Sequence, residues 1–140
     1  MVNQNTAPYA ALVLRLTLGV MFIAHALLKV VVFTVPGTVQ FFESVGLPGV
    51  LAYIVIAAEL GAGVLLIAGV ATRWIALATI PILLGAAWVH LPNGWVFSAQ
   101  GGGWEYPVFL AIAAFVQFLL GDGAYALASR PAPLATGRAA

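Results

Sequence analysis

Four long stretches of apolar residues, with almost no charge inside them, constrain this chain more than any other feature. A helix that crosses a lipid bilayer needs about 20 mostly apolar residues, within a range of about 17–25. The qualifying stretches are Ala10–Val32, Val50–Val70, Trp74–His90 and Glu105–Leu120. The last two are short, which suits a thin bilayer or little tilt. Only 6% of the residues are charged, whereas a soluble domain carries about 25%. The sequence therefore predicts an all-α integral membrane bundle of four transmembrane helices.

The composition also limits what the protein binds. Its 140 residues include no cysteine, which excludes disulfides, thiol relays, iron–sulfur ligation and Cys-based zinc sites within this chain. Any redox chemistry here therefore needs a bound cofactor to carry the electrons, and we predict neither an intrinsic cofactor nor a metal site. The net charge is +1 and no basic tract is present, so we expect no nucleic acid partner. The expected partners are the lipid bilayer and either a partner protein or a second copy of the chain.

Charges in the connections predict how the spans are oriented. One side of the membrane receives Arg73, Arg130 and Arg138, with Arg15 just inside the first span. The other side receives Lys29, Glu43 and Glu105. By the positive-inside rule, both termini face the cytoplasm. The predicted organisation is a cytoplasmic segment at residues 1–9, the transmembrane domain at residues 10–127 and a disordered cytoplasmic tail at residues 128–140.

The two outer connections differ in character. The first, residues 33–49, is expected to hold a short helix that lies in the membrane interface, with Thr38 as its cap and Phe41 and Phe42 on it. Gly46, which is followed by a proline two residues later, is expected to end this helix. The second connection carries three consecutive glycines at residues 101–103. Such a run fits either a flexible loop or a close backbone approach to a ligand.

Ionisable residues inside the spans are the informative positions, because each costs about 2.5–3.5 kcal/mol at a helix centre. Arg15, His25 and Lys29 fall on one stripe of the first span, which must face the bundle interior. Glu59 lies near the middle of the second span among small residues. Counting from the membrane ends predicts an Arg15–Glu59 ion pair. Such a pair fits either a functional role or a purely structural clamp.

A second polar group is expected near the outer face. By the same counting, the predicted binding pocket there contains His25, Lys29, His90, Trp104 and Glu105. In it, His25 and His90 would hydrogen-bond a head group or a quinone carbonyl, and Glu105 would balance Lys29. Bis-histidine haem ligation is disfavoured because the depths of the two histidines match poorly. The alternative is that these groups simply bond one another and the loops.

Several segments are recognisable together. The first span reads RLTLGVMFIAHALLK over residues 15–29. Further matching segments are Gly46-Leu47-Pro48, Glu59 with Gly61 and Gly63, Gly69 with Thr72-Arg73, His90, and GGWEYP at residues 102–107. Over about residues 10–127 the chain resembles the DoxX family of small four-helix membrane proteins. Ala26 departs from the family pattern, which usually has glycine after the histidine, but alanine still permits close packing.

The resemblance implies a place in the bacterial plasma (inner) membrane and a link to redox enzymes. The family takes its name from a membrane subunit associated with a thiosulfate:quinone oxidoreductase. Other members are linked to membrane-bound oxidoreductase complexes that handle oxidative and thiol stress. This implication strengthens the fold prediction more than the functional one, since fold does not determine function.

Three functions follow as hypotheses. The leading one is a membrane subunit of an oxidoreductase system with a quinone-facing pocket, for which the candidate catalytic groups are His25, His90 and Glu105. The second is a non-catalytic membrane anchor or assembly factor for a partner enzyme. The third is a small-solute transporter that uses Glu59 and Arg15 as a proton-coupling pair.

Overall fold

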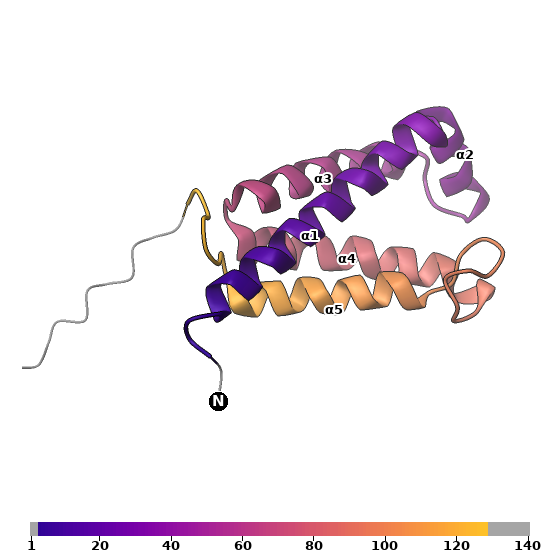
Figure 1. Ribbon diagram of the computed structural model, residues 1–140. Coiled ribbons are helices and arrows are strands. Elements are labelled where there is room, and N and C mark those ends of the chain that lie inside the picture. Colours follow the sequence, from indigo (N-terminus) through magenta and orange to yellow (C-terminus); the bar gives the residue numbers. More distant parts are fainter. Residues whose placement is uncertain (1–2, 129–140) are drawn as a thin grey trace, which may run out of the picture.

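The computed structural model describes residues 3–128. These residues form helices joined by irregular segments, and they contain no strand (Figure 1). The long helices are α1 (Ala7–Leu27), α3 (Val50–Ala68), α4 (Thr72–His90) and α5 (Glu105–Leu120), and the short helix α2 (Val35–Ser44) joins α1 to α3. A π-helical segment, η1 (Leu28–Val32), extends α1, and a 3-10 turn, η2 (Leu91–Asn93), follows α4. The all-α prediction is thus confirmed. The predicted tail lies outside the described residues from residue 129 onward, as do Arg130 and Arg138.

Three helical stretches are long and apolar enough to cross a membrane: α1 with η1, α3, and α4 with η2. The fourth predicted span, α5, is apolar but has only 16 residues. At 1.5 Å per residue it extends about 24 Å, less than the hydrocarbon core of about 30 Å. By length and composition, three predicted spans are confirmed as candidates, and the four-span count stays a prediction.

The long helices form two pairs, α1 with α3 and α4 with α5. The pairs diverge toward the end of the molecule that carries α2 (Figure 1). Within the first pair the backbones touch at two glycines. A Cβ added to Gly63 would lie 2.8 Å from the Gly19 carbonyl oxygen, and one added to Gly19 would lie 2.9 Å from the Gly63 oxygen. No larger residue fits this crossing, which therefore sets the register between α1 and α3.

The structure differs from the prediction by two residues at the end of α3 and by two residues at the start of α4. The sequence predicted a span to Val70, but α3 ends at Ala68 because Gly69 adopts a left-handed conformation (φ 71°). Two hydrogen bonds close this end: Gly69 N–H donates to the Leu66 carbonyl (3.1 Å), and Val70 N–H donates to the Leu65 carbonyl (3.0 Å). This is the usual glycine stop signal. The connection between α3 and α4 is short, and α4 begins at Thr72, two residues before the predicted start of the span at Trp74.

The predicted short helix in the first outer connection is present as α2, but its cap is Thr34 and not Thr38. The Thr34 hydroxyl accepts a hydrogen bond from the Gly37 N–H (3.3 Å). Pro36 lies in the first turn, where a missing N–H costs nothing, so the cap must precede it. Thr38 is instead buried at the second turn of α2.

Candidate functional site

Arg15 is buried, with 1% of its surface exposed. Its guanidinium donates hydrogen bonds to the carbonyl oxygens of Ile67 (3.5 Å) and Ala124 (3.1 Å). The first lies in the last turn of α3 and the second in the segment that follows α5. Arg15 therefore holds the end of α3 and the segment after α5 against α1, which is a structural role.

The predicted Arg15–Glu59 ion pair is wrong, and the register of the helices explains why. The contact between Gly19 and Gly63 places Arg15 level with Ile67 in the antiparallel pair α1–α3. Glu59 lies eight residues away from that level, which is about 12 Å along the helix. The Arg15 side chain also leans toward the N-terminus of α1, away from Glu59, as helical side chains do. The proton-coupling pair required by the transport hypothesis is therefore not formed.

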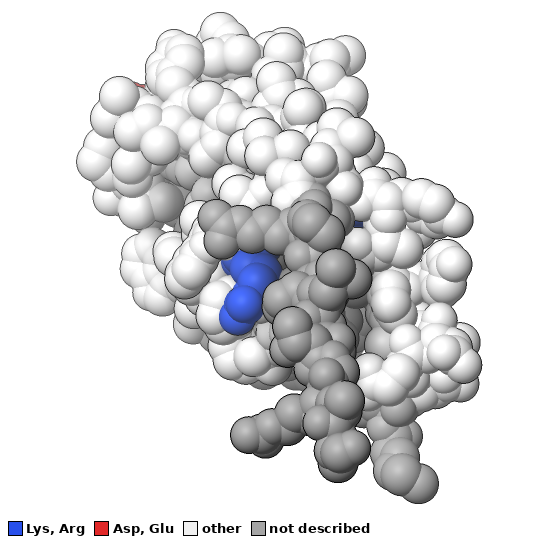
Figure 2. Space-filling view, turned by 90° about the vertical axis from the view of Figure 1, so that its left-hand side faces the viewer, with Lys and Arg blue, Asp and Glu red and all other residues white. Residues whose placement is uncertain are grey.

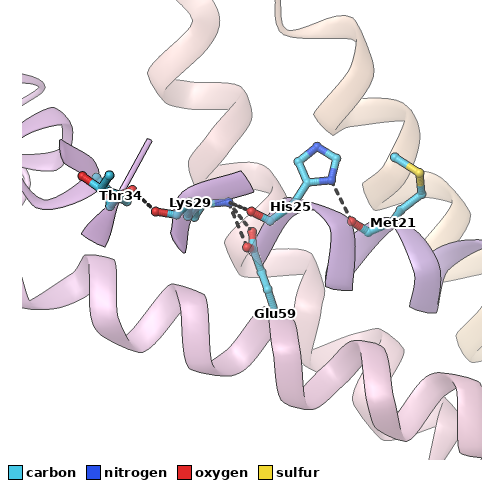
Figure 3. A network of polar contacts seen from close by, with 6 residues as sticks. Met21, His25, Lys29, Thr34 and Glu59 are labelled. Atoms are coloured by element: carbon cyan, nitrogen blue, oxygen red, sulfur yellow. Dashed lines mark hydrogen bonds and ion pairs between the residues drawn. The ribbon is translucent and has the colours of Figure 1, made fainter. Parts of the chain in front are cut away.

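Glu59 pairs with Lys29 instead (Figure 3). The Lys29 ammonium donates to both carboxylate oxygens, at 2.8 and 2.9 Å, and to the His25 carbonyl at 3.5 Å. The two side chains are only 19% and 8% exposed. In such surroundings each charge depends on the other, because an unpaired buried charge is strongly destabilising.

The backbone around Lys29 is unusual. It belongs to η1, where the Phe33 N–H donates to the Leu28 carbonyl at 2.9 Å, five residues back. Such widened turns are rare and frequently occur at functional sites. The Thr38 hydroxyl of α2 donates toward the Lys29 carbonyl (2.9 Å) and lies 3.0 Å from the Thr34 carbonyl. Thr38 thus ties α2 to the turn that aims Lys29 at Glu59.

We predict that Thr38→Val lowers the free energy of unfolding by about 1–2 kcal/mol, because a buried carbonyl loses its donor. Amide hydrogen exchange in detergent or lipid nanodiscs should accelerate first in α2 and η1. Thr38→Ser keeps the hydroxyl and should lose clearly less. An equal loss in both variants would show that the methyl group, not the hydroxyl, holds α2 in place.

A cavity of about 900 Å³ lies between the two helix pairs, toward the end that carries α2. This volume is within the range of about 300–1,000 Å³ that is typical of small-molecule sites. Most of its lining is apolar, with Pro81 and Gly85 in the α4 wall. The polar side chains that line it are those of His25, Lys29, Glu59, His90 and Tyr106. The structure therefore brings both predicted histidines and the Lys29–Glu59 pair to one hollow.

His25 is held in a defined orientation. Its Nδ1 lies 2.7 Å from the Met21 carbonyl oxygen, and its ring stacks on Tyr106 of α5 with centroids 5.9 Å apart and planes 24° from parallel. Figure 3 shows the second ring nitrogen pointing away from both Met21 and Glu59. Within residues 3–128, no hydrogen bond reaches that nitrogen. Because His25 lines the cavity, this nitrogen is a candidate hydrogen-bonding group for a ligand there.

His90, at the end of α4, is oriented by the connection that precedes α5. Its Nδ1 lies 3.5 Å from the Asn93 amide nitrogen, which also donates to the carbonyls of Gly101 (3.0 Å) and Gly102 (2.9 Å). The ring also packs on Gly102, where an added Cβ would lie 3.5 Å from Nδ1. The Gly102 backbone therefore lies close to the His90 side chain, and the close approach of this glycine run to a ligand stays a prediction.

Glu105 and Trp104 were predicted in the same pocket, and neither lines the cavity. The Glu105 carboxylate accepts a hydrogen bond from the Phe97 N–H (2.9 Å), so it braces the loop and does not balance Lys29. It faces a smaller hollow of about 380 Å³ on the other side of the loop. Trp104 packs edge-on against Trp95, with ring centroids 4.5 Å apart. Both residues shape the loop that supports the cavity.

Among known protein families, the DoxX family model matches residues 10–91, which is more than half of the chain. The chain belongs to the DoxX family. Its sequence is also 43% identical, over 75 residues, to a Bacillus subtilis (strain 168) protein named "Putative oxidoreductase CatD". That alignment covers 54% of this chain and 54% of the relative, so the chain spans about half the length of the curated relative it matches. No solved structure matches the chain significantly.

Family membership and the apolar helices together mark this DoxX chain as a multi-pass membrane protein. The match to the DoxX model includes His25, Lys29, Glu59 and His90 but ends before α5. Sequence reasoning missed Tyr106, the cavity residue on α5 that stacks on His25. No clear signal for Tyr106 was present in the sequence, because an aromatic residue near the outer end of a span is also typical of the membrane interface.

Proposed function

We propose that this DoxX protein is the membrane subunit of an oxidoreductase system and that its cavity binds the ring of a quinone. One observation carries the proposal: two imidazoles, whose Nε2 atoms make no hydrogen bond within residues 3–128, line a largely apolar cavity of about 900 Å³. A quinone ring is apolar on its faces and polar at two oxygens. The cavity matches that pattern, with apolar walls and a few convergent polar groups.

In this proposal, a partner enzyme supplies the electrons for quinone reduction, and residues of the cavity exchange the protons. A quinone becomes a hydroquinone by taking up two electrons and two protons. Because this chain has no cysteine, no thiol or iron–sulfur group of its own can deliver the electrons, and a partner enzyme must do so. Histidine, in contrast, exchanges protons near neutral pH. We assign His25 and His90 to hydrogen bonding at the two oxygens of the reduced ring.

The similarity to the Bacillus subtilis protein supports one part of the proposal, the link to oxidoreductases. A protein that shares 43% of its residues over 75 aligned positions carries an oxidoreductase name. The aligned 75 residues cannot include the whole cavity, whose lining extends from Leu18 to Leu110. The quinone and the partner are therefore proposals that rest on the cavity and not on the name.

We further propose that all four long helices cross the bacterial plasma membrane with both termini in the cytoplasm. Arg73 is exposed at the beginning of α4, and buried Arg15 lies toward the same end of the bundle. On the face drawn in Figure 2, one large patch of basic side chains is exposed and only a trace of acidic surface is visible. Glu43 and Glu105 lie on α2 and α5 near the opposite end. This distribution agrees with the positive-inside rule.

A cavity-filling variant tests the quinone proposal. Gly85 lines the cavity, and a Cβ added there meets nothing within 4 Å, so leucine has room there and narrows the hollow. In lipid nanodiscs, Gly85→Leu should bind para-benzoquinone with a decyl tail at least about tenfold more weakly than the unchanged protein, a loss of about 1.4 kcal/mol.

Gly61→Leu is the matched control, because Gly61 is also helical and open but does not line the cavity. It should bind the probe as the unchanged protein does. Equal binding by both variants would overturn the proposal. If neither variant nor the unchanged protein bound the probe, the anchor hypothesis would become the leading one.

A further inference from the structure

We infer that the cavity distinguishes the reduced from the oxidised form of its ligand: His25 accepts a hydrogen bond from a ligand hydroxyl, and His90 donates one to a ligand oxygen. This inference rests on the proposed quinone-binding function and names the form that the site prefers, the hydroquinone. It follows from the hydrogen bonds that fix the tautomer of each imidazole.

The tautomer of His25 is set by its own helix. Its Nδ1 lies 2.7 Å from the Met21 carbonyl oxygen, and a carbonyl oxygen can only accept a hydrogen bond. Nδ1 therefore carries the hydrogen. A neutral imidazole has one N–H, so Nε2, which points away from Met21 and Glu59 in Figure 3, presents a lone pair.

The surroundings of His90 favour the other tautomer, with the hydrogen on Nε2. The Asn93 amide nitrogen lies within 3.0 Å of two carbonyl oxygens, those of Gly101 and Gly102, which fixes which end of the amide is the nitrogen. That nitrogen, a donor only, lies 3.5 Å from His90 Nδ1. Both amide hydrogens already serve the two carbonyls, so Nδ1 receives no hydrogen from Asn93, but a hydrogen on Nδ1 would point at a nitrogen that cannot accept it. We therefore place the hydrogen of His90 on Nε2 and the lone pair on Nδ1.

The charged groups nearby do not supply His25 with an anionic partner. Glu59 is bonded through both oxygens to Lys29, and Glu105 accepts from the Phe97 backbone. The Lys29 ammonium lies at the carbonyl of His25, on the backbone side. Within residues 3–128 no salt bridge involves His25. With Nδ1 directed at the Met21 carbonyl, Nε2 is therefore the atom of the ring that is placed to accept a hydrogen bond.

A hydroquinone satisfies both imidazoles. One of its hydroxyls donates to His25 Nε2, and the oxygen of the other accepts from His90 Nε2–H. A quinone oxygen, in contrast, only accepts, so at His25 it would place two lone pairs against each other. Losing one hydrogen bond while leaving a polar atom unpaired corresponds to a difference of about tenfold in affinity.

The test compares three probes that share ring and tail: decyl-para-benzoquinone, its hydroquinone, and the dimethyl ether of that hydroquinone. Binding is measured without oxygen, on the full chain in lipid nanodiscs, with empty nanodiscs as the correction for partitioning. We expect the hydroquinone to bind about tenfold more tightly than the quinone or the ether. The ether matters because it keeps both oxygens as acceptors and the aromatic ring but has methyl groups in place of the two hydroxyl donors. The quinone, which is smaller and also lacks donors, controls for the added bulk.

Two variants assign the preference to one histidine. His25→Phe keeps a ring to stack on Tyr106 and removes the acceptor, so the three probes should bind with nearly equal affinity. His90→Phe removes a donor that all three probes use, so affinities should fall together while the hydroquinone preference remains. Loss of the preference in His90→Phe alone would overturn the assignment.

The outcomes separate the two proposals. If none of the probes binds, the quinone-binding function itself fails. If they bind equally, or the quinone binds most tightly, the inference fails while the quinone site stands. Nitrogen NMR of the unchanged protein gives a second, independent reading. We expect hydrogen on Nδ1 of His25 and on Nε2 of His90, and hydrogen on Nε2 of neutral His25 would overturn the inference.

Discussion

Replacing Lys29 with methionine is expected to lower the free energy of unfolding by about 3–5 kcal/mol, because it leaves a buried carboxylate without its counter-ion. The partner, Glu59, is 8% exposed and receives two hydrogen bonds from Lys29. Glu59→Leu should cost less, since the longer Lys29 side chain is 19% exposed and can turn its ammonium toward water.

The double variant Lys29→Met/Glu59→Leu is the decisive control. It removes both charges and replaces them with apolar groups, so it should recover most of the stability lost in Lys29→Met. Unfolding in mixed detergent micelles, followed by circular dichroism, gives the three free energies of a double-mutant cycle. Additive losses would contradict a coupled buried pair and would place the two groups in separate, solvated environments.

Replacing Gly63 with valine is expected to destabilise the protein by about 3 kcal/mol. A Cβ at Gly63 would lie 2.8 Å from the Gly19 carbonyl oxygen and 2.6 Å from the Ile23 side chain. The Ile23 side chain can move, but the carbonyl belongs to the backbone of α1, so the two helices must separate. Overpacking of this kind typically costs about 1–3 kcal/mol, and a backbone clash lies at the upper end.

Gly61→Val is the matched control, two residues away on the same helix. A Cβ at Gly61 meets nothing within 4 Å, so the same change of residue should leave stability within about 0.5 kcal/mol. Thermal unfolding of both variants in the same detergent makes the comparison. A similar loss in both would mean that valine disfavours this helix by itself and that the α1–α3 crossing is not tight.

Register also decides which residues form the site. The crossing of Gly19 and Gly63 places Ile67 level with Arg15. It leaves Glu59 within reach of Lys29, whose side chain leans back toward the N-terminus of its helix. Because the pair lies on the cavity wall, a change of register would remove charge from the cavity as well as weaken the packing. Stability and site geometry are coupled through two glycines.

Much of the helical layout followed from local signals. The apolar runs and the position of Glu105 placed the helices to within a few residues, because helix length is encoded nearby in the chain. The stop signal at Gly69 was available locally, but the predicted span extended two residues beyond the end of α3. Even the error over the α2 cap had a local cause, since Pro36 marks the first turn and points to Thr34. The π-helical turn at Lys29 had no such signal, because it depends on Thr38 from another helix.

The sequence by itself determined that this chain is helical and apolar and that its polar residues must face inward, because lipid excludes them. It also placed His25, Lys29 and His90 near one another, and all three line one cavity, while their role in binding stays a proposal. Only the tertiary structure decided the partners: Lys29 for Glu59, backbone carbonyls for Arg15, and the Phe97 amide for Glu105. Partner choice depends on the depth and rotation of each helix relative to its neighbours, and those quantities are set by packing contacts between residues far apart in the chain.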